Sequence, residues 1–359
     1  MAMPNARDIE RTRAEVGAWL AGRLGAGRVD VGAVSFPKAG FSNETIFLTA
    51  QWQDAGETHT EELVLRIEPT SHQLFVKPDA LFQAAMMTAL GEHDGTPVPR
   101  IWFTETDASI LGAPFFLMER KHGRIPADVP SYHVKGWMTE LTPSQVWRLY
   151  DSGIAALAAL HRIDWRDGFE FLDQGRAGRA WPAYLEELDK WYSWAAPSRI
   201  FDPDVLDEAY RYIVGRAPRA TAEGIVWGDA RVGNMMFSDD QQVVAMFDWE
   251  TATLGPPEVD LGWWLMFEDF LASAQGVARL EGTPGRAEII SRYERASGRR
   301  VADIDYYQLL ACVVMSLVNS RLGQLLMENH GMSDERAGQW ARRTIRMAGD
   351  LLNVIRERA

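Results

Sequence analysis

The spacing of apolar residues changes near Arg120, and this change divides the chain into a strand-rich part and a helix-rich part. Over residues 29–67, three short runs alternate in the manner of antiparallel strands and are separated by glycine and polar turns. A helix is expected over 80–90, and two more strand-like runs follow at 100–104 and 114–118. The first part therefore predicts a small antiparallel sheet accompanied by helices.

Beyond Arg120 the apolar residues recur at the spacing of amphipathic helices. At 142–145 the sequence Thr-Pro-Ser-Gln combines an N-cap, a proline at the first helical position and a capping-box glutamine, ahead of a helix expected over 146–161. Further helices are expected over 181–194, 205–214, 260–275, 304–326 and 334–357, with one β-type interruption at 225–249. A chain of 359 residues is too long for one compact core, so we predict an α+β fold with two lobes, 1–118 and 119–359.

The composition excludes several classes of partner. The formal charge of −13 provides no basic surface for nucleic acid or for anionic lipid. The single cysteine, Cys312, cannot form an intramolecular disulfide, and its aliphatic neighbours predict a buried thiol. The longest apolar run, 309–318, is about half of the roughly 20 residues that a membrane-spanning helix needs, and no apolar secretory segment follows Met1. We therefore expect a cytoplasmic protein without a membrane or nucleic-acid partner.

Residues with catalytic potential are concentrated in the β-type stretch 225–249. Its sequence predicts a hairpin, with strands at 235–237 and 242–247 joined by a turn at 238–241. Asn234 immediately precedes the first strand, and Asp248 immediately follows the second. Antiparallel pairing therefore brings these two side chains to the same edge of the hairpin.

An amide oxygen beside a carboxylate provides the hard oxygen ligands that Mg²⁺ prefers, and water and substrate phosphates complete the coordination. We therefore expect Asn234 and Asp248 to hold a magnesium ion. Asp229 lies on the loop just before Asn234, where it is placed to orient a substrate hydroxyl and to accept its proton. Arg231 is the second catalytic candidate, and the sequence leaves open whether it reaches phosphate or braces the metal loop.

This stretch resembles the family of aminoglycoside phosphotransferases and choline kinases, whose usual motif is H-G-D-x4-N, a hairpin and I-D-x-[DE]. The corresponding sequences here are W-G-D-A-R-V-G-N, at 227–234, and F-D-W-E, at 247–250. The branch related to the kinase-like domain of certain acyl-CoA dehydrogenases is more similar still, because its D-W-E-x-A-T-L-G and D-L-x-W patterns match 248–255 and 260–263. The resemblance extends over most of the chain. It implies a bilobal protein-kinase-like fold, with ATP and Mg²⁺ as cofactors and a small-molecule hydroxyl as phosphoryl acceptor.

The resemblance also implies a nucleotide-binding site in the first lobe. The heptad A-G-F-S-N-E-T, at 39–45, resembles the phosphate-covering turn, where glycine permits close backbone approach and polar side chains donate to phosphate oxygens. The strand at 63–66 ends with Arg66, at the position where the family carries its phosphate-binding cation. The segment 111–120 resembles the family's last strand of this lobe and the hinge that follows it, whose backbone binds adenine. The cofactor-binding residues implied in this way are Gly40, Ser42, Asn43, Arg66, Glu119 and Lys121.

Three positions depart from the family pattern. Trp227 stands where the family commonly has a histidine, so we expect packing to orient the catalytic loop in place of an imidazole. Arg66 replaces the usual lysine, and its planar guanidinium is not equivalent to an ammonium group. Gln83 has the best register for the usual glutamate partner, and it would give Arg66 a hydrogen bond in place of an ion pair. These departures motivate an alternative function, a catalytically impaired nucleotide-binding regulatory protein or pseudokinase.

Other polar and aromatic residues near the motif have structural interpretations. Asp260 is expected to cap the following helix or to brace the catalytic loop, and His161 is expected to interact with carbonyl groups at a helix end. Glu250 is assigned either to a second magnesium ion or to a structural carboxylate. The tryptophans at 181, 191, 194 and 264 are expected to pack in the core, with the lining of an acceptor pocket as the alternative.

The prediction that combines these observations is an ATP-dependent phosphotransferase that moves the γ-phosphoryl group to a hydroxyl of a small molecule. The branch resemblance favours a hydroxyacyl thioester or a similar metabolite as the acceptor, whereas the broader family suggests an aminoglycoside, and the sequence leaves both open. A metal-dependent hydrolase that uses the Asp cluster is a third interpretation. The sequence contains no Walker A motif, G-x-S-x-G elbow or paired-cysteine zinc spacing.

Overall fold

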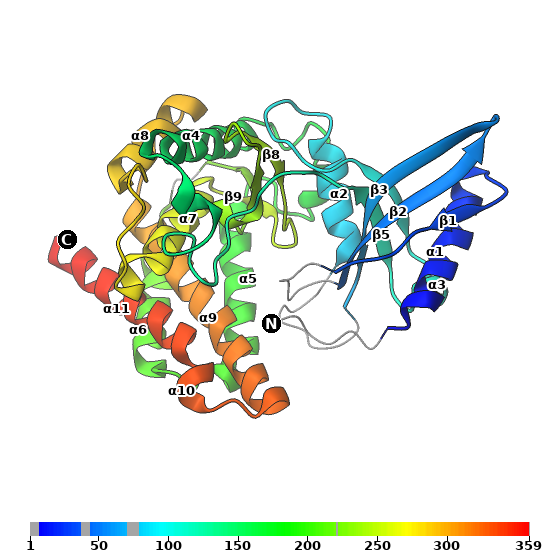
Figure 1. Ribbon diagram of the computed structural model, residues 1–359. Helices are drawn as coiled ribbons and strands as arrows, with labels where there is room; N and C mark the ends of the chain where they lie inside the picture. The colour runs from blue at the N-terminus through cyan, green and yellow to red at the C-terminus, as the bar shows by residue number, and fades with distance from the viewer. Residues whose placement is uncertain (1–6, 37–43, 70–78, 220–221, 359) are drawn as a thin grey trace. The chain divides into compact units, whose positions relative to one another are not determined.

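The computed structural model describes residues 7–36, 44–69, 79–219 and 222–358. The chain forms two compact units, the first made of Met1–Glu92 with Val98–Lys121 and the second of His93–Pro97 with His122–Ala359 (Figure 1). The functional boundary expected between residues 118 and 119 stays a prediction, because compactness does not reveal which unit binds nucleotide or acceptor.

The first unit contains the small antiparallel sheet that the sequence predicted, and its strands lie in the order β1-β2-β3-β5-β4. β1, β2, β3 and β5 are labelled in Figure 1. β2 and β3 form the longest ladder and are joined at Ala55 and Gly56, both with positive φ, as a tight two-residue hairpin turn requires. The strands are β1 Val29–Val31, β2 Glu44–Asp54, β3 Glu57–Ile67, β4 Ile101–Glu105 and β5 Phe115–Glu119.

Helices lie on opposite faces of this sheet (Figure 1). α1, Ile9–Leu24, buries Val16 and Leu20 in the same core as Leu65 of β3, and it ends where Gly25 adopts a left-handed conformation. Side chains alternate along a strand, so Arg66 points to the other face, toward α2, Ala80–Leu90. A short helix, α3 Ala108–Leu111, precedes β5.

The second unit is mainly helical, which confirms the predicted α+β architecture of a small sheet and a larger helical part. Its α-helices are α4 Pro143–Leu160, α5 Ala180–Trp194, α6 Pro203–Gly215, α7 Glu258–Leu271, α8 Arg286–Ser297, α9 Ile304–His330, α10 Asp334–Ala337 and α11 Gln339–Arg358. The 3₁₀ turns of this unit are η1 Trp137–Glu140, η2 Glu170–Leu172, η3 Ala196–Ser198, η4 Val232–Asn234 and η5 Ser273–Gln275. α8 was not expected from the sequence, and the helix expected over 334–357 is interrupted at Gly338.

The 27-residue helix α9 packs against α7 and α11 in the centre of this unit. Its apolar stretch is longer than the run at 309–318 indicated, and by length and composition it could cross a membrane, although 61% of its most apolar window is buried inside the protein. Cys312 is 1% exposed, as predicted, and burial raises the pKa of its thiol above the ordinary value. Core packing therefore accounts for the apolar composition of α9.

Two short antiparallel pairs lie in and beside the stretch 225–249, in which the sequence predicted a single hairpin. The predicted hairpin is formed by β7, Met235–Phe237, and β8, Val243–Met246. A second pair joins β6, Gly224–Val226, to β9, Thr253–Gly255, and β9 was not predicted.

Backbone bonds to distant segments extend the β7–β8 hairpin on both sides. Arg124 and Phe237 exchange two backbone bonds of 2.8 and 2.9 Å. On β8, Met246 N–H donates to the carbonyl of Pro97 at 2.8 Å. The hairpin is therefore fixed within the second unit, and the segment that follows Lys121 is brought alongside it.

Candidate active site

The open end of the β7–β8 hairpin brings Asn234 and Asp248 together. Met235 is paired with Met246, and one step further out Phe247 N–H donates to the Asn234 carbonyl at 3.0 Å. Asp248 follows in a left-handed conformation, with φ of 56°, which turns the chain out of the strand. The hairpin thus provides the juxtaposition that the sequence predicted, while the assignment of both residues as metal ligands stays a prediction.

The Asp229 carboxylate accepts three side-chain hydrogen bonds. Oδ1 accepts from Arg231 Nε at 2.9 Å and from Trp263 Nε1 at 2.7 Å. Oδ2 accepts from Asn234 Nδ2 at 2.6 Å, and the same amide group lies 3.1 Å from the Asp229 carbonyl. With 26% of its side chain exposed, Asp229 is held firmly and remains accessible to a ligand.

Arg231 joins Asp229 to a residue that the sequence did not indicate, Asp128. Its Nη1 donates to Asp128 Oδ2 at 2.5 Å, and its guanidinium lies 4.8 Å from the centre of the Phe267 ring. Burial alone would lower the pKa of Arg231, but the charges of Asp128 and Asp229 outweigh burial and raise this pKa above its ordinary value. Of the two roles left open for Arg231, this geometry matches the bracing of the loop.

Asp128 lies against the backbone of Gly233. A Cβ at Gly233 would be 2.6 Å from Asp128 Oδ1 and 2.2 Å from Arg231 Nη1, so the absence of a side chain makes room for the ion pair. Oδ1 is buried and accepts no hydrogen bond from the described part of the chain, although the side chain as a whole is 32% exposed. Burial raises the pKa of Asp128, and the attraction of Arg231 only partly opposes this effect.

A buried polar cluster fixes the segment that carries Asp128. Tyr132 and Tyr150 both donate to Glu268 Oε1, at 2.7 and 2.9 Å, and the Ser131 hydroxyl donates to the Leu271 carbonyl at 2.7 Å. Burial raises the pKa of both tyrosine hydroxyls well above the ordinary value, so they remain donors. The segment near Asp128 is therefore anchored to α7.

Trp227 orients the loop by hydrogen bonding as well as by packing. Its ring stacks on that of Trp249, with centroids 5.1 Å apart, as the expectation of packing required. In addition, Nε1–H donates to the carbonyls of Phe247 and Asp248 at 2.9 and 3.2 Å. The expectation of packing alone is therefore incomplete, because the indole supplies an N–H donor to the backbone next to the candidate metal site.

Asp260 braces the backbone on the other side of this loop, which was one of its two expected roles. Its carboxylate accepts the N–H groups of Trp227 and Gly228 at 2.6 and 2.7 Å. The two ring nitrogens of His161 lie 3.0 Å from Asp260 Oδ2 and 2.7 Å from the Tyr293 hydroxyl. The expectation that the His161 ring contacts helix-end carbonyls is therefore wrong, because both nitrogens are used in this buried network.

The oxygen donors at the hairpin edge fit a divalent cation. Because Asn234 Nδ2 faces two acceptors of Asp229, the amide oxygen is directed elsewhere, and it accepts no hydrogen bond from the residues that the structure describes. The charge of Asp248 raises the pKa values of both Asp128 and Arg231, which shows that negative charge accumulates here. No group of three or more His, Cys, Asp or Glu residues suited to a metal occurs among the described residues. A magnesium ion would therefore depend on Asn234, Asp248 and ligands from nucleotide and water.

The proposed phosphate-contacting side of the first unit is described only in part. Gly40, Ser42 and Asn43 lie outside the described residues. Arg66 Nη2 lies 3.5 Å from Gln83 Oε1, which is long for a hydrogen bond. The neutral side chain expected at position 83 therefore does face the Arg66 guanidinium.

Glu119 is the last residue of β5, and Lys121 is the last residue of the first unit. The Glu119 N–H already donates to the Arg100 carbonyl at 2.9 Å, so this group is committed to the sheet. The Lys121 ammonium lies 2.9 Å from Glu119 Oε1. The Glu119 N–H is therefore not available to adenine, and any adenine contact at this residue would use its other groups.

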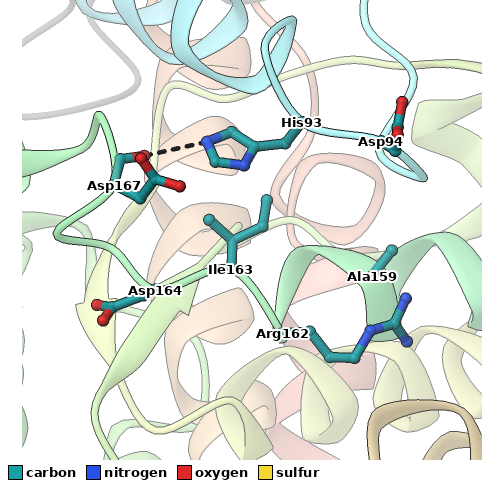
Figure 2. Close-up of a pocket in the computed structure, with 7 residues that line it drawn as sticks. All are labelled: His93, Asp94, Ala159, Arg162, Ile163, Asp164 and Asp167. Atoms are coloured by element: carbon teal, nitrogen blue, oxygen red, sulfur yellow. Dashed lines mark hydrogen bonds between the residues drawn. The ribbon is translucent and has the colours of Figure 1, made fainter.

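A separate pocket lies in the second unit, away from the residues of the D-x4-N motif. It has a volume of about 270 Å³ and lies between the segment of His93 and the end of α4 (Figure 2). Its lining residues are His93, Asp94, Ala159, Arg162, Ile163, Asp164 and Asp167. The two basic groups are partly engaged, because His93 Nε2 lies 3.0 Å from the Asp167 carbonyl and Arg162 Nη1 contacts the Ala296 carbonyl. This pocket contains none of the residues expected to bind nucleotide or metal.

The remaining predicted residues, several tryptophans and Glu250, differ in burial. Trp181 and Trp264 are 5% and 1% exposed, which favours the expected role in packing, whereas Trp194 is 36% exposed. Glu250 is half-buried next to Trp249, and both of its possible roles stay open. Asp128 and Trp263 are the site residues that sequence reasoning missed, and only the D-L-G-W segment gave a signal for the second.

Comparison with protein families gives one match that covers most of the chain. The profile described as "Phosphotransferase enzyme family" matches residues 33–300. Among curated proteins, acyl-CoA dehydrogenase family member 10 of Mus musculus is 28% identical over 272 residues, which are 73% of this chain and 23% of that protein. Family member 11 of Homo sapiens is 25% identical over 291 residues, 77% of this chain and 34% of that protein. The chain thus spans about a quarter to a third of the length of these two relatives.

Solved structures show the same fold. A candidate aminoglycoside phosphotransferase from Ralstonia eutropha has a TM-score of 0.70 and 22% identity, covering 95% of this chain and 98% of that one. A thermostable mutant of aminoglycoside phosphotransferase APH(4)-Ia, in ternary complex with ADP and hygromycin B, has a TM-score of 0.59 and 11% identity over 94% and 98% of the two chains. The kinase-like fold expected from the sequence is confirmed by these similarities.

Proposed function

Because this chain belongs to the phosphotransferase enzyme family, we propose that it transfers the γ-phosphoryl group of ATP to a hydroxyl group of a small molecule. The observation that carries the proposal is the Asp229 carboxylate, held by Arg231, Trp263 and Asn234 beside the hairpin end where Asp248 lies. A carboxylate fixed in this way next to oxygen ligands for a divalent cation has the arrangement that phosphoryl transfer requires.

Asp229 acts as the group that orients the acceptor hydroxyl and receives its proton. The hydroxyl O–H bond breaks as its oxygen forms a bond to the γ-phosphorus, and the bond from this phosphorus to the ADP oxygen breaks. The three hydrogen bonds to Asp229 hold the carboxylate in one orientation, so little reorganisation is needed when the acceptor binds.

Asn234 and Asp248 would hold Mg²⁺, which when bound neutralises phosphate charge and polarises the γ-phosphoryl group. Trp227 keeps the Phe247 and Asp248 carbonyls in place, and Asp260 does the same for the N–H groups on the opposite side of the loop. Arg231 braces Asp229 against Asp128. Each of these residues orients a group of this chain.

The nucleotide phosphates are assigned to Gly40, Ser42, Asn43 and Arg66, and adenine to the backbone near Glu119 and Lys121. The family membership and the similarity to a structure that holds ADP support the use of a nucleotide. Arg66 supplies a permanent positive charge on the α2 side of the sheet. ATP is the nucleotide that we propose.

For the acceptor we favour a hydroxyacyl thioester or a similar metabolite over an aminoglycoside. The relatives named as acyl-CoA dehydrogenases are 25% and 28% identical to this chain, whereas the two antibiotic-kinase structures above are 22% and 11% identical. The acidic balance of the chain, −13, would attract a polycationic antibiotic, but net charge describes the whole surface and not the pocket.

The first test is ADP release in the presence of ATP and Mg²⁺ with a panel of hydroxylated acyl-CoAs and of aminoglycosides. We expect release to depend on one class of acceptor, and we expect Asp229→Ala to lower kcat by about a thousandfold or more because the hydroxyl loses its proton acceptor. Asp240→Ala is the matched control, since Asp240 is an exposed carboxylate in the turn of the same hairpin. Undiminished activity in Asp229→Ala would show that the base is assigned wrongly.

A catalytically impaired nucleotide-binding protein is the second candidate, and the neutral contact between Arg66 and Gln83 favours it. In that case ATP would bind, and the panel would give no ADP above the Asp229→Ala blank. Gln83→Glu would then be informative, because it places a carboxylate at position 83, where the family usually has a glutamate, and turnover would rise if the neutral side chain at this position limits activity. Under either function the cytoplasm remains the proposed location, without a nucleic-acid or membrane partner.

A further inference from the structure

The hydrogen bonds of Asp229 are distributed unequally between its two oxygens. An ionised carboxylate offers about four acceptor positions, two on each oxygen. Both positions of Oδ1 are used, by Arg231 Nε at 2.9 Å and by Trp263 Nε1 at 2.7 Å. Oδ2 accepts one bond, from Asn234 Nδ2, and no other described residue donates to it. One acceptor position on Oδ2 therefore remains for a ligand.

We propose that Trp263 is a positioning residue that, together with Arg231, saturates Oδ1 and makes Oδ2 the atom of Asp229 that receives the acceptor proton. This inference rests on the proposed function and names an atom and a residue for its proton-transfer step. Without the indole N–H, Oδ1 would offer a competing acceptor position. The hydroxyl would then bind in two ways, only one of which is aligned with the γ-phosphoryl group.

The position of the Trp263 indole is fixed by the helix that carries it. Asp260, Trp263 and Phe267 are three and four residues apart on α7, so they share one face of the helix. Asp260 binds the loop backbone, Trp263 binds Asp229, and the Phe267 ring lies beneath Arg231. The Trp263 and Phe267 rings are themselves in contact, with centroids 5.6 Å apart. One face of α7 therefore positions both donors to Oδ1. Trp263 belongs to this face, and Arg231 packs against Phe267, which also belongs to it.

The adjacent residue provides a matched control. Trp264 is 1% exposed, and its Nε1 has no hydrogen-bond partner within the described ranges. Its ring faces Gly153 on α4, where an added Cβ would lie 2.9 Å from Cη2. Trp264→Phe and Trp263→Phe therefore remove the same atoms from the same helix, but only the second removes a bond to Asp229.

The kinetic test compares the kinetic profile of the full chain and both variants, which is kcat together with KM for ATP. In Trp263→Phe the acceptor position freed on Oδ1 lets the hydroxyl bind in a second, misaligned way, so we expect kcat to fall about tenfold while KM for ATP stays unchanged. Trp264→Phe should keep the wild-type profile. Coincident profiles for the two variants would overturn the inference.

A second readout does not depend on turnover. In the ¹⁵N-tryptophan-labelled protein, the indole resonance that disappears in Trp263→Phe is expected to shift in Asp229→Asn, whereas the Trp264 resonance stays in place. If the chemical shift of the Trp263 indole is the same in wild type and in Asp229→Asn, the hydrogen bond between Trp263 and Asp229 does not exist. If the Trp263 resonance responds to Asp229→Asn but the wild type releases no ADP with any acceptor, the proposed function is refuted. If the wild type is active but Trp263→Phe and Trp264→Phe have the same kinetic profile, only the role of Trp263 is refuted.

Discussion

Gly233 shows how the absence of one side chain determines the charge arrangement of the candidate site. Its φ lies outside the left-handed region, so glycine is needed here for lack of space and not for its backbone conformation. A methyl group there would occupy the volume of the ion pair between Asp128 and Arg231. The glycine of the D-x-R-x-G-N motif is thereby linked to an acidic residue 103 positions from Arg231 in the sequence.

Gly233→Ala is expected to lower kcat about tenfold while the protein still folds, because misplacing Arg231 disturbs the Asp229 carboxylate. The obstructing atoms are the ends of flexible side chains, so we expect the free energy of unfolding to fall by only about 1 kcal/mol. Initial rates and thermal unfolding measure the two effects. Gly215→Ala, where the new methyl group meets nothing within 4 Å, should leave both unchanged. Full activity in Gly233→Ala would contradict this role of the ion pair.

The residues that could be predicted from sequence are those held together by local geometry. Asn234 and Asp248 flank a hairpin, so antiparallel pairing alone places them side by side. Asp128 and Trp263 could not be placed in this way, because they reach the site from separate segments through tertiary packing. The Trp227 indole was predicted to pack, but its hydrogen bonds depend on the path of the Phe247 and Asp248 backbone.

At the scale of elements, Glu105 attaches α1 to the end of β4. Its Oε2 accepts from Trp19 Nε1 at 2.7 Å and from Arg23 Nη2 at 2.9 Å, and its Oε1 accepts the N–H groups of Thr106 and Asp107. The backbone N–H of Asp107, followed by the Trp19 indole, lowers the pKa of Glu105 from 4.5 to about 2.

The lowered pKa gives a pH-dependent prediction. Since the folded state binds the proton of Glu105 more weakly than the unfolded state does, the stabilisation is fully present above about pH 4.5 and is lost as the pH falls toward about 2. Glu105→Gln should reduce the protection of the α1 amides against hydrogen exchange by about 1 kcal/mol at pH 7, with a difference from wild type that shrinks below pH 4.5. Glu61→Gln, an exposed carboxylate on β3, is the control. A difference that persists unchanged down to pH 3 would rule out the charge as its cause.

Periodicity predicted long helices well and short or narrow elements poorly. α8 buries only Ile289, Tyr293 and Ser297, a stripe too narrow to stand out from its charged residues. Its signals lay at the ends, where Glu288 returns to the Gly285 N–H at 2.8 Å and Gly298 ends the helix. β9 was missed because its three residues form a strand only through pairing with β6.

At the scale of the whole molecule, an acidic chain concentrates further negative charge at its candidate site. The net charge is −13, and Asp128, Asp229 and Asp248 lie around Arg231. Adding a nucleotide triphosphate to such a site without a cation would be opposed by repulsion. Nucleotide binding should therefore be coupled to binding of the divalent cation.

We expect ATP to raise the Tm of the full chain only when Mg²⁺ is present, and EDTA to abolish the shift. At a concentration of ATP 100 times its Kd the stabilisation would be about 2.7 kcal/mol. Asp248→Asn should reduce the shift strongly, whereas Asp240→Asn, in the exposed turn between β7 and β8, should preserve it. Equal shifts with and without Mg²⁺ would argue against Asn234 and Asp248 as metal ligands.

The division of the chain into units has a consequence for any attempt to exchange or remove one of them. The polypeptide passes from one unit to the other three times, after Glu92, Pro97 and Lys121. Excising residues 1–118 as a block would take the Pro97 carbonyl away from the Met246 N–H and leave an edge of β8 without its partner. A chimera that keeps the hairpin intact must graft 1–92 and 98–121 as two separate pieces and retain the five residues between them.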